Sequence, residues 1–478
     1  MIIKQKKWTV LQFIYAILLG GLLLGYLLIQ AFDHEPFSYP VWLAFLRVLV
    51  AVLGIWLGKL WKDEGFQIII LLYLLQIVRI AFKDSWLFFT DSVSDNFING
   101  IWAIAGCYSL GRVLSLHQLK TFLHIVFTSW IIGIVIQCLI SLYGAFTDQG
   151  FTNLYGVSIW EGGSIWGIIW EERLTVGFLY PTVTGSYLGF SAMAAAYSTI
   201  TEKKKALKIV NGFAFAIIIF ALGLTDSRAS YVSAAAGFGI IAFLLVLKAI
   251  KDKERNKKEK EIRIAKDKKK VWCIAAICMA FVFIFSLLAI FSVAPVFNRM
   301  KAKGASVISV AKADEAIKKT QQVISRGVSG QDVLSGRFTV WKGTVSYIFE
   351  KPLRLLFGVS VYNPMAGPNQ KMGTQMAHCH NIVIQILLES GITGVILALS
   401  FVLYTLKNFF QIIQKEGTPI WILILPALFI SILVGDMAEC FTWFRSWNSV
   451  ALAFLFVTAG IINTSRDQRV INVEESLA

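Results

Sequence analysis

Residues 376–394 read MAHCHNIVIQILLESGITG and join the longest polar loop of the chain to an apolar helix. The pair His380-Asn381 stands where this helix begins, and Gly391 and Gly394 follow within the apolar stretch. A titratable side chain at the border between water and a hydrocarbon-facing helix is costly to keep, so it indicates a functional site. We therefore start from His380 and ask which other residues reach it.

The composition indicates a polytopic membrane protein. The 478 residues are 56% hydrophobic and the mean hydropathy is +0.67. Apolar runs of about twenty residues recur, and this is the length that a helix needs to cross a bilayer. The first run, LQFIYAILLGGLLLGYLLIQ at residues 11–30, is too long for a signal peptide and lacks a cleavage site of the A-x-A type. We expect it to remain as the first spanning helix.

The apolar runs predict an all-α fold with about twelve transmembrane helices. These helices are expected at residues 8–31, 41–61, 66–82, 97–115, 119–146, 174–200, 208–226, 229–250, 271–294, 381–406, 418–436 and 441–463. The large loop before the tenth helix combines many lysines with apolar residues at helical spacing, so it predicts short amphipathic helices on the membrane surface, as a lid or platform. The predicted regions are an N-terminal transmembrane half (1–200), central helices with a basic loop at 251–270 (201–294), the large loop (295–380), and C-terminal helices with a tail (381–478).

The net charge of +16 is explained by membrane topology. Many basic residues lie in one block from Lys248 to Lys270, and most others flank predicted helices, which is typical of cytoplasmic loops. With a cytoplasmic N-terminus, all basic clusters fall on the cytoplasmic side and the large loop is extracytoplasmic. We therefore expect no nucleic-acid partner, and we assign no chemistry to the basic block.

The six cysteines form no recognisable metal or disulfide motif. Four lie in apolar segments without C-x-x-C spacing: Cys107, Cys138, Cys273 and Cys278. Cys379 and Cys440 are expected on the outer face, where oxidation is permitted. They are either free thiols or a disulfide pair, and the sequence does not fix their separation.

Two arginines on the predicted outer face are candidates for binding phosphate. Arg228 precedes a helix rich in small residues, and Arg337 stands one helical turn before Trp341. A guanidinium binds phosphate oxygens in a bidentate manner, so the two arginines can clamp a lipid-linked diphosphate. The alternatives are that each arginine only extends its charge to the interface and that His380 is a structural, hydrogen-bonded residue. All three residues on one face favour a site.

The sequence around His380 resembles the O-antigen ligase and Wzy-type polymerase superfamily of bacterial membrane glycosyltransferases. His380-Asn381 is followed by nine residues, Gly391, two residues and Gly394, which is the His-containing motif of that family. Further similarities span residues 205–400 and comprise Ser227-Arg228, Arg337 with Trp341, and Pro352 with Phe357-Gly358. Two family glycines are replaced by small residues, Ala229 and Ser360.

The resemblance implies a GT-C-like membrane fold and a metal-independent, inverting glycosyl transfer. The donor would be an undecaprenyl-diphosphate-linked glycan on the outer face of the bacterial cytoplasmic membrane. Arg228 and Arg337 would stabilise the leaving diphosphate, because the sequence shows no D-x-D motif or His/Asp cluster for a metal, and no cofactor is expected. His380 would position or deprotonate the acceptor hydroxyl. We assign substrate binding to Ser227, Trp341, Tyr362 and Asn381.

Other residues compete for these roles. The alternative carboxylates are Asp226, Glu389, Asp436 and Glu439. Of these, Glu389 lies well inside the predicted helix, where a structural hydrogen bond is expected. A group of tryptophans either stacks on sugar rings or lies in the interfacial belt: Trp160, Trp166 and Trp170.

Three functions remain open at this level. A polymerase transfers the glycan to another lipid-linked repeat unit, and a ligase transfers it to a lipid, protein or wall polymer. We favour the polymerase because the Lys-rich and Ile-rich composition is compatible with a bacterium that lacks lipopolysaccharide. The expected partners are the donor, the glycan acceptor and the bilayer, together with a chain-length regulator and a flippase. The alternative that the chain is itself a flippase predicts paired repeats with polar residues near the midplane, and the polar residues here gather at one interface instead.

Overall fold

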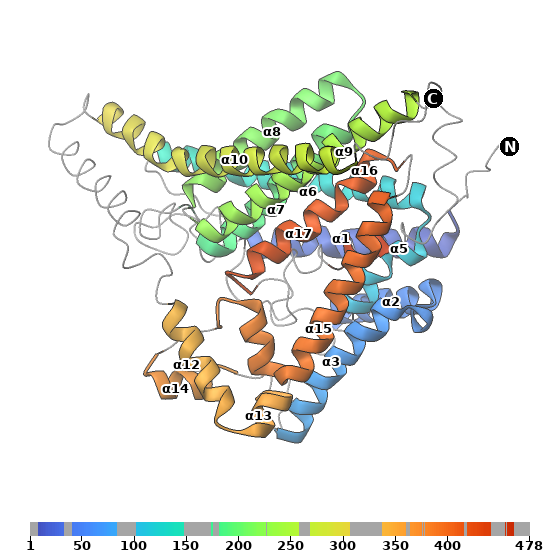
Figure 1. The fold of residues 1–478 in the computed structure, drawn as a ribbon, viewed down its shortest axis with the longest axis vertical. Coiled ribbons are helices and arrows are strands. Elements are labelled where there is room, and N and C mark those ends of the chain that lie inside the picture. The colour runs from blue at the N-terminus through green and yellow to red at the C-terminus, as the bar shows by residue number, and fades with distance from the viewer. Residues whose placement is uncertain are drawn as a thin grey trace.

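A computed structural model describes most of the chain. The described residues are 8–32, 41–83, 102–147, 174, 181–225, 227–257, 268–305, 337–359, 364–374, 376, 378–414, 418–440, 455 and 457–462. All regular elements within these ranges are helices (Figure 1). The all-α prediction is confirmed for this part of the chain.

Five described helices are long and apolar enough to cross a membrane. They are α6 (Leu116–Thr147), α8 (Lys205–Leu224), α9 (Arg228–Lys257), α10 (Lys268–Ala305) and α15 (Ile382–Gln414). The other main helices of the bundle are α1 (Val10–Phe32), α2 (Val41–Gly58), α3 (Glu64–Lys83), α7 (Pro181–Thr201) and α17 (Leu425–Asp436). The chain is therefore a multi-pass membrane protein, and the number of about twelve spans stays a prediction.

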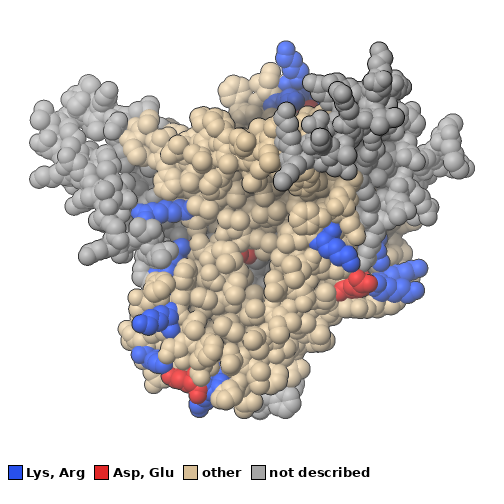
Figure 2. All heavy atoms as spheres, in the orientation of Figure 1, with Lys and Arg blue, Asp and Glu red and all other residues tan. Residues whose placement is uncertain are grey.

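The outer surface of this bundle is apolar. In the most apolar stretch of α10, only 11% of the residues are buried inside the protein. The exposed residues of this helix include Phe281, Phe285 and Leu288. Figure 2 shows one face of the described residues, where charged side chains lie mostly at the periphery around a broad uncharged area. Apolar side chains at such a density require a hydrocarbon solvent rather than water.

Several predicted helices differ from those of the structure. The predicted helix 97–115 is broken into a π-helix, η3 (Trp102–Cys107), and a single turn, α5 (Leu110–Val113). The predicted helix 418–436 is divided into α16 (Ile420–Leu423) and α17, because Pro426 starts a new helix. The predicted end at residue 294 is wrong, since α10 continues through Pro295 to Ala305.

Helix α9 lies at the centre and fixes the position of Arg228. Its small residues Ala234 and Ala235 are fully buried, and it runs antiparallel to α17. Ser233 and Ser431 exchange hydrogen bonds between side-chain hydroxyl and backbone carbonyl, at 2.6 and 2.9 Å. At the other end of α9, Lys248 Nζ donates to the carbonyl of Thr418 at 3.0 Å. The first residue of α9, Arg228, therefore lies at the same end of the bundle as the residues that follow α17.

The large predicted loop contains three short helices with a small core of their own. These helices are α12 (Arg337–Phe349), α13 (Pro352–Phe357) and α14 (Ala366–Met372). Their buried residues Val340, Ile348 and Met365 pack with Cys379 and Leu388, which belong to the His380 motif and the following helix. Figure 1 shows this α12–α14 unit at the end of the molecule away from α8 and α10. The amphipathic helices were predicted at residues 297–327, of which 297–305 belong to α10 and the rest lie outside the described residues.

Helix α15 is not the straight helix that the sequence predicts over 381–406. Gly391 has φ 66° and ψ −167°, so α15 consists of two limbs that meet at this residue, with α13 beside the junction in Figure 1. A Cβ atom on Gly391 would lie 2.4 Å from the backbone of Leu356, and one on Gly358 would lie 2.3 Å from the backbone of Glu389. Both glycines are therefore required for the close approach of α13 to the junction, which explains Gly391 of the His-containing motif and Gly358 of the pair Phe357-Gly358.

Candidate active site

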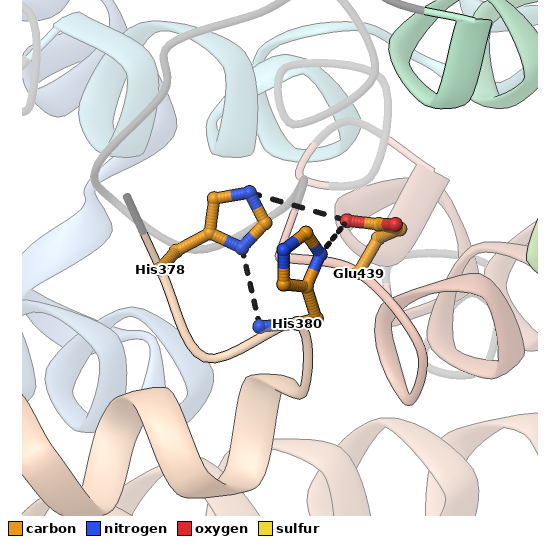
Figure 3. Close-up of side chains that lie close together, drawn as sticks. All are labelled: His378, His380 and Glu439. Atoms are coloured by element: carbon orange, nitrogen blue, oxygen red, sulfur yellow. Dashed lines mark hydrogen bonds and ion pairs between the residues drawn. The ribbon is translucent and has the colours of Figure 1, made fainter. Parts of the chain in front are cut away.

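His380 lies immediately before α15 in an unusual backbone conformation. Its φ is 51°, in the left-handed region that few residues other than glycine adopt. Such a conformation costs free energy and persists only where the surrounding structure requires it, which is common at functional sites. It directs the imidazole toward the loop that follows α17 (Figure 3).

Glu439 is the direct partner of His380. The distance from His380 Nδ1 to Glu439 Oε2 is 2.9 Å, and the side chains are 27% and 2% exposed. A carboxylate oxygen can only accept, so Nδ1 carries the hydrogen and donates it to Glu439. In the neutral ring with its hydrogen on Nδ1, Nε2 of His380 has the lone pair that can accept a proton from a substrate.

Arg337 holds the other oxygen of the same carboxylate. The distance from Arg337 Nη2 to Glu439 Oε1 is 2.6 Å, and the arginine side chain is 19% exposed. A carboxylate that is almost fully removed from water needs such compensation, and charge-assisted bonds supply it. Glu439 therefore connects the predicted phosphate-binding arginine to the predicted catalytic histidine.

His378 is a third side chain that faces Glu439 (Figure 3). Its Nδ1 accepts the backbone N–H of His380 at 3.2 Å, and its Nε2 lies 4.0 Å from Glu439 Oε2. The two imidazole centroids are 4.1 Å apart. We did not predict a role for His378 from the sequence, although the spacing H-x-H within the quoted stretch is a signal for two imidazoles on one turn.

The neighbouring side chains fix the turn that carries both histidines. Trp341 Nε1 donates to the carbonyl of Cys379 at 2.8 Å, and the N–H of Cys379 donates to Gln385 Oε1 at 2.9 Å. Asn381 Oδ1 accepts the N–H groups of the next helical turn, at 3.0 and 3.1 Å, and so caps α15. Asn381 Nδ2 also donates to the carbonyl of Met437 at 2.9 Å, which ties this turn to the segment that carries Glu439.

Six of the seven predicted site residues lie in the described part of the chain. Four of them converge around Glu439: His380, Asn381, Arg337 and Trp341. Ser227 is buried, with its hydroxyl 2.7 Å from that of Ser230. Arg228 is partly exposed, and no ion pair joins it to another described residue. Tyr362 lies outside the described residues, and direct contact of these residues with a substrate stays a prediction.

The competing carboxylates are separated by the structure. Glu439 contacts His380, whereas Glu389 is buried and accepts a hydrogen bond from Gln385 Nε2 at 2.5 Å. This structural bond agrees with the expectation for Glu389. Asp436 is also buried. Outside the described residues lie Asp226, Trp160, Trp166 and Trp170.

Cys379 and Cys440 are free thiols in the structure. Cys379 is buried with its Sγ 3.6 Å from Met365 Sδ. Burial raises the pKa of the Cys440 thiol well above its usual value, and the negative charge of Asp436 adds to this effect. Each cysteine adjoins a site residue in sequence, and neither is bonded to the other.

Comparison with known proteins agrees with the motif. Residues 213–399 match the family model described as O-Antigen ligase, close to the range 205–400 over which the sequence shows the resemblance. This segment contains Arg228, Arg337, His380 and Gly391, and it ends before Glu439. No curated protein matches the chain. The match over residues 213–399 supports the resemblance of the sequence to the O-antigen ligase and Wzy-type polymerase superfamily.

Proposed function

We propose that the protein is a glycosyltransferase that polymerises lipid-diphosphate-linked repeat units, with undecaprenyl diphosphate as the lipid carrier, on the outer face of the bacterial cytoplasmic membrane. The observation that carries this proposal is the arrangement of His380, Glu439 and Arg337, in which one buried carboxylate holds both an imidazole and a guanidinium. The family model that matches residues 213–399 supports the class of substrate.

The acceptor hydroxyl is activated by His380 in this proposal. The hydroxyl oxygen attacks the anomeric carbon of the donor sugar while its proton passes to Nε2 of His380. The ring becomes positively charged, and Glu439, at 2.9 Å from Nδ1, stabilises that charge. Glu439 is thus a positioning residue, and His380 is the group that touches the reacting hydroxyl.

The leaving group is stabilised by arginine. The bond between the anomeric carbon and the diphosphate oxygen breaks as the new glycosidic bond forms, so negative charge accumulates on the lipid diphosphate. Arg337 donates to Glu439 through Nη2, and a guanidinium has further N–H donors for a phosphate oxygen. Arg228 lies at the same end of α9 and α17 and supplies the second positive charge. Attack opposite to the leaving group inverts the anomeric configuration.

The position of the site suits a substrate with a lipid tail. His380 and Glu439 lie at the ends of the apolar helices α15 and α17, rather than in their middle. A diphosphate bound there remains at the interface while its polyprenyl chain stays in hydrocarbon. The partly exposed imidazole and guanidinium remain accessible from the aqueous side.

Ligation is the second candidate function, because it uses the same donor and differs only in the acceptor. To separate the two, purified full-length protein is incubated with lipid-diphosphate-linked repeat units alone. A ladder of longer glycans supports the polymerase. Transfer only after addition of a lipid, protein or wall-polymer acceptor identifies a ligase. Failure to consume the donor with every acceptor refutes glycosyl transfer altogether.

A further inference from the structure

We propose that His378, His380 and Glu439 bind a divalent transition-metal ion of the zinc class, and that an ion bound there inhibits the transfer reaction. One ligand atom of each residue lies within 4.8 Å of the other two. The inhibition rests on the proposed function, whereas the binding follows from the geometry alone. Sequence alone does not reveal the cluster, because Glu439 is 59 positions away from His380.

The three ligand atoms already lie close to a metal-binding arrangement. Glu439 Oε2 is 2.9 Å from His380 Nδ1 and 4.0 Å from His378 Nε2. In a tetrahedral zinc site with bonds of about 2.0–2.2 Å, neighbouring ligand atoms are about 3.3–3.6 Å apart. Small rotations of two partly exposed imidazoles close this difference. Two histidines and one carboxylate with an open fourth position form an established ligand set for zinc.

The neighbouring residues orient the carboxylate ligand, and metal binding requires His378 to change its tautomer. Arg337 binds Oε1 and so orients Glu439 while Oε2 faces the two imidazoles. An ion on Nε2 of His378 moves the ring hydrogen to Nδ1, which breaks the bond from the backbone N–H of His380. That bond is 3.2 Å long, at the upper limit for an N–H donor. It is therefore the weakest contact that binding has to displace.

The ligand types determine which ions fit. Imidazole nitrogen suits zinc, copper, nickel and cobalt, whereas magnesium and calcium prefer all-oxygen sites. Inhibition follows from the same atoms. An ion on Nδ1 of His380 transfers the ring hydrogen to Nε2, so Nε2 has no lone pair for the proton of the acceptor hydroxyl. The ion also withdraws Glu439 from its role beside the imidazole.

The binding test uses metal-free, full-length protein in detergent, titrated with zinc chloride by calorimetry and with cobalt chloride by visible absorption. We expect one ion per chain and a tetrahedral cobalt spectrum. His378→Gln should weaken zinc binding about tenfold or more, since even the outer-shell partners of metal ligands contribute that much. His117→Gln is the matched control, because His117 is exposed on α6, and it should leave binding unchanged. Glu439→Gln should weaken binding as His378→Gln does, which provides a second variant if one fails to fold.

Inhibition is measured separately, in the transfer assay. Zinc chloride should slow the parent protein, magnesium chloride should not, and His378→Gln should need more zinc for the same effect. Absence of stoichiometric binding, or equal binding in the parent and both ligand variants, overturns the metal site. Zinc that binds without slowing transfer overturns the inhibition. Zinc binding by a protein that transfers no glycan supports the site and refutes the proposed function instead.

Discussion

Replacement of Glu439 by glutamine tests the connection between the arginine and the histidine. The substitution keeps the size of a side chain that is 2% exposed, and it removes the charge that both partners require. The amide oxygen of glutamine can still accept a hydrogen bond from Arg337 or His380, but the amide NH₂ group then faces the other of these two donors. We therefore expect the protein to fold, because size and packing are retained, and the chemical step to fail.

The magnitude follows from the two contacts of the carboxylate. Glu439 accepts from Arg337 at 2.6 Å and from His380 at 2.9 Å, and hydrogen bonds to charged groups contribute about 1.5–3 kcal/mol each. Breaking a buried ion pair costs about 3–5 kcal/mol. The imidazole becomes positive during transfer, so we expect the loss of the Glu439 charge to raise the free energy of the transition state by about 3–4 kcal/mol. A change of about 1.4 kcal/mol corresponds to a tenfold change in rate. The expected loss in kcat is therefore about 100-fold to 1000-fold.

The assay is the initial rate of donor consumption with a chelator present, so that no adventitious ion contributes. We expect kcat, normalised to the amount of folded protein, to fall and KM for the lipid-linked donor to change little. The normalisation is needed because a smaller amount of active protein also lowers the apparent kcat without a change in KM. Glu350→Gln is the matched control on the α12–α14 unit, because Glu350 pairs with Lys371 and Arg354 at the surface. A kcat of Glu439→Gln close to that of the Glu350→Gln control would refute the positioning role.

The two arginines, the Cys440 thiol and the α15 junction at Gly391 can each be tested by one substitution or labelling experiment. Arg228→Lys and Arg337→Lys should each reduce transfer by about tenfold or more, because lysine keeps the charge but lacks the planar fork; wild-type rates in both variants would exclude the clamp. Burial raises the pKa of Cys440, so the rate of its labelling by a membrane-impermeant maleimide should be low at pH 7. This rate should rise about tenfold per pH unit up to pH 9, and a plateau within this range would contradict the raised pKa. Gly391→Ala should lower the midpoint of thermal unfolding in detergent, because φ 66° and the α13 backbone leave no room for a Cβ atom. Gly212→Ala is the control and should leave the midpoint unchanged, because a Cβ atom there meets open space. Equal midpoints for the two variants would show that the close approach is not required.

The spanning helices are predictable because hydrocarbon solvent acts on each segment separately. An apolar run such as that of α8 or α6 carries its own signal, and its bounds in the structure differ from the prediction by a few residues. Breaks within such runs are harder to predict. The two limbs of α15 depend on the contact between Gly391 and the backbone of α13, and hydropathy along one segment contains no information about a tertiary contact.

The site was predictable only in its parts. His380, Arg337 and Trp341 stand out because charged or polar side chains at a membrane interface are costly. The position of Glu439 beside His380 depends on the antiparallel packing of α9 with α17 and on the bond from Asn381 to Met437. Neither feature has a local sequence pattern, so Glu439 remained one of several competing carboxylates. His378 is a candidate site residue only through its distance from Glu439.

In the proposed function, His380 takes the proton of the acceptor hydroxyl while a glycan is transferred from a lipid diphosphate. The most direct measurement compares the release of lipid diphosphate from labelled donor by the parent and by His380→Ala, at equal amounts of folded protein in the same membranes. We predict a ladder of products with matching release of lipid diphosphate for the parent, and neither for His380→Ala. Glycans of normal length made by His380→Ala would contradict the account.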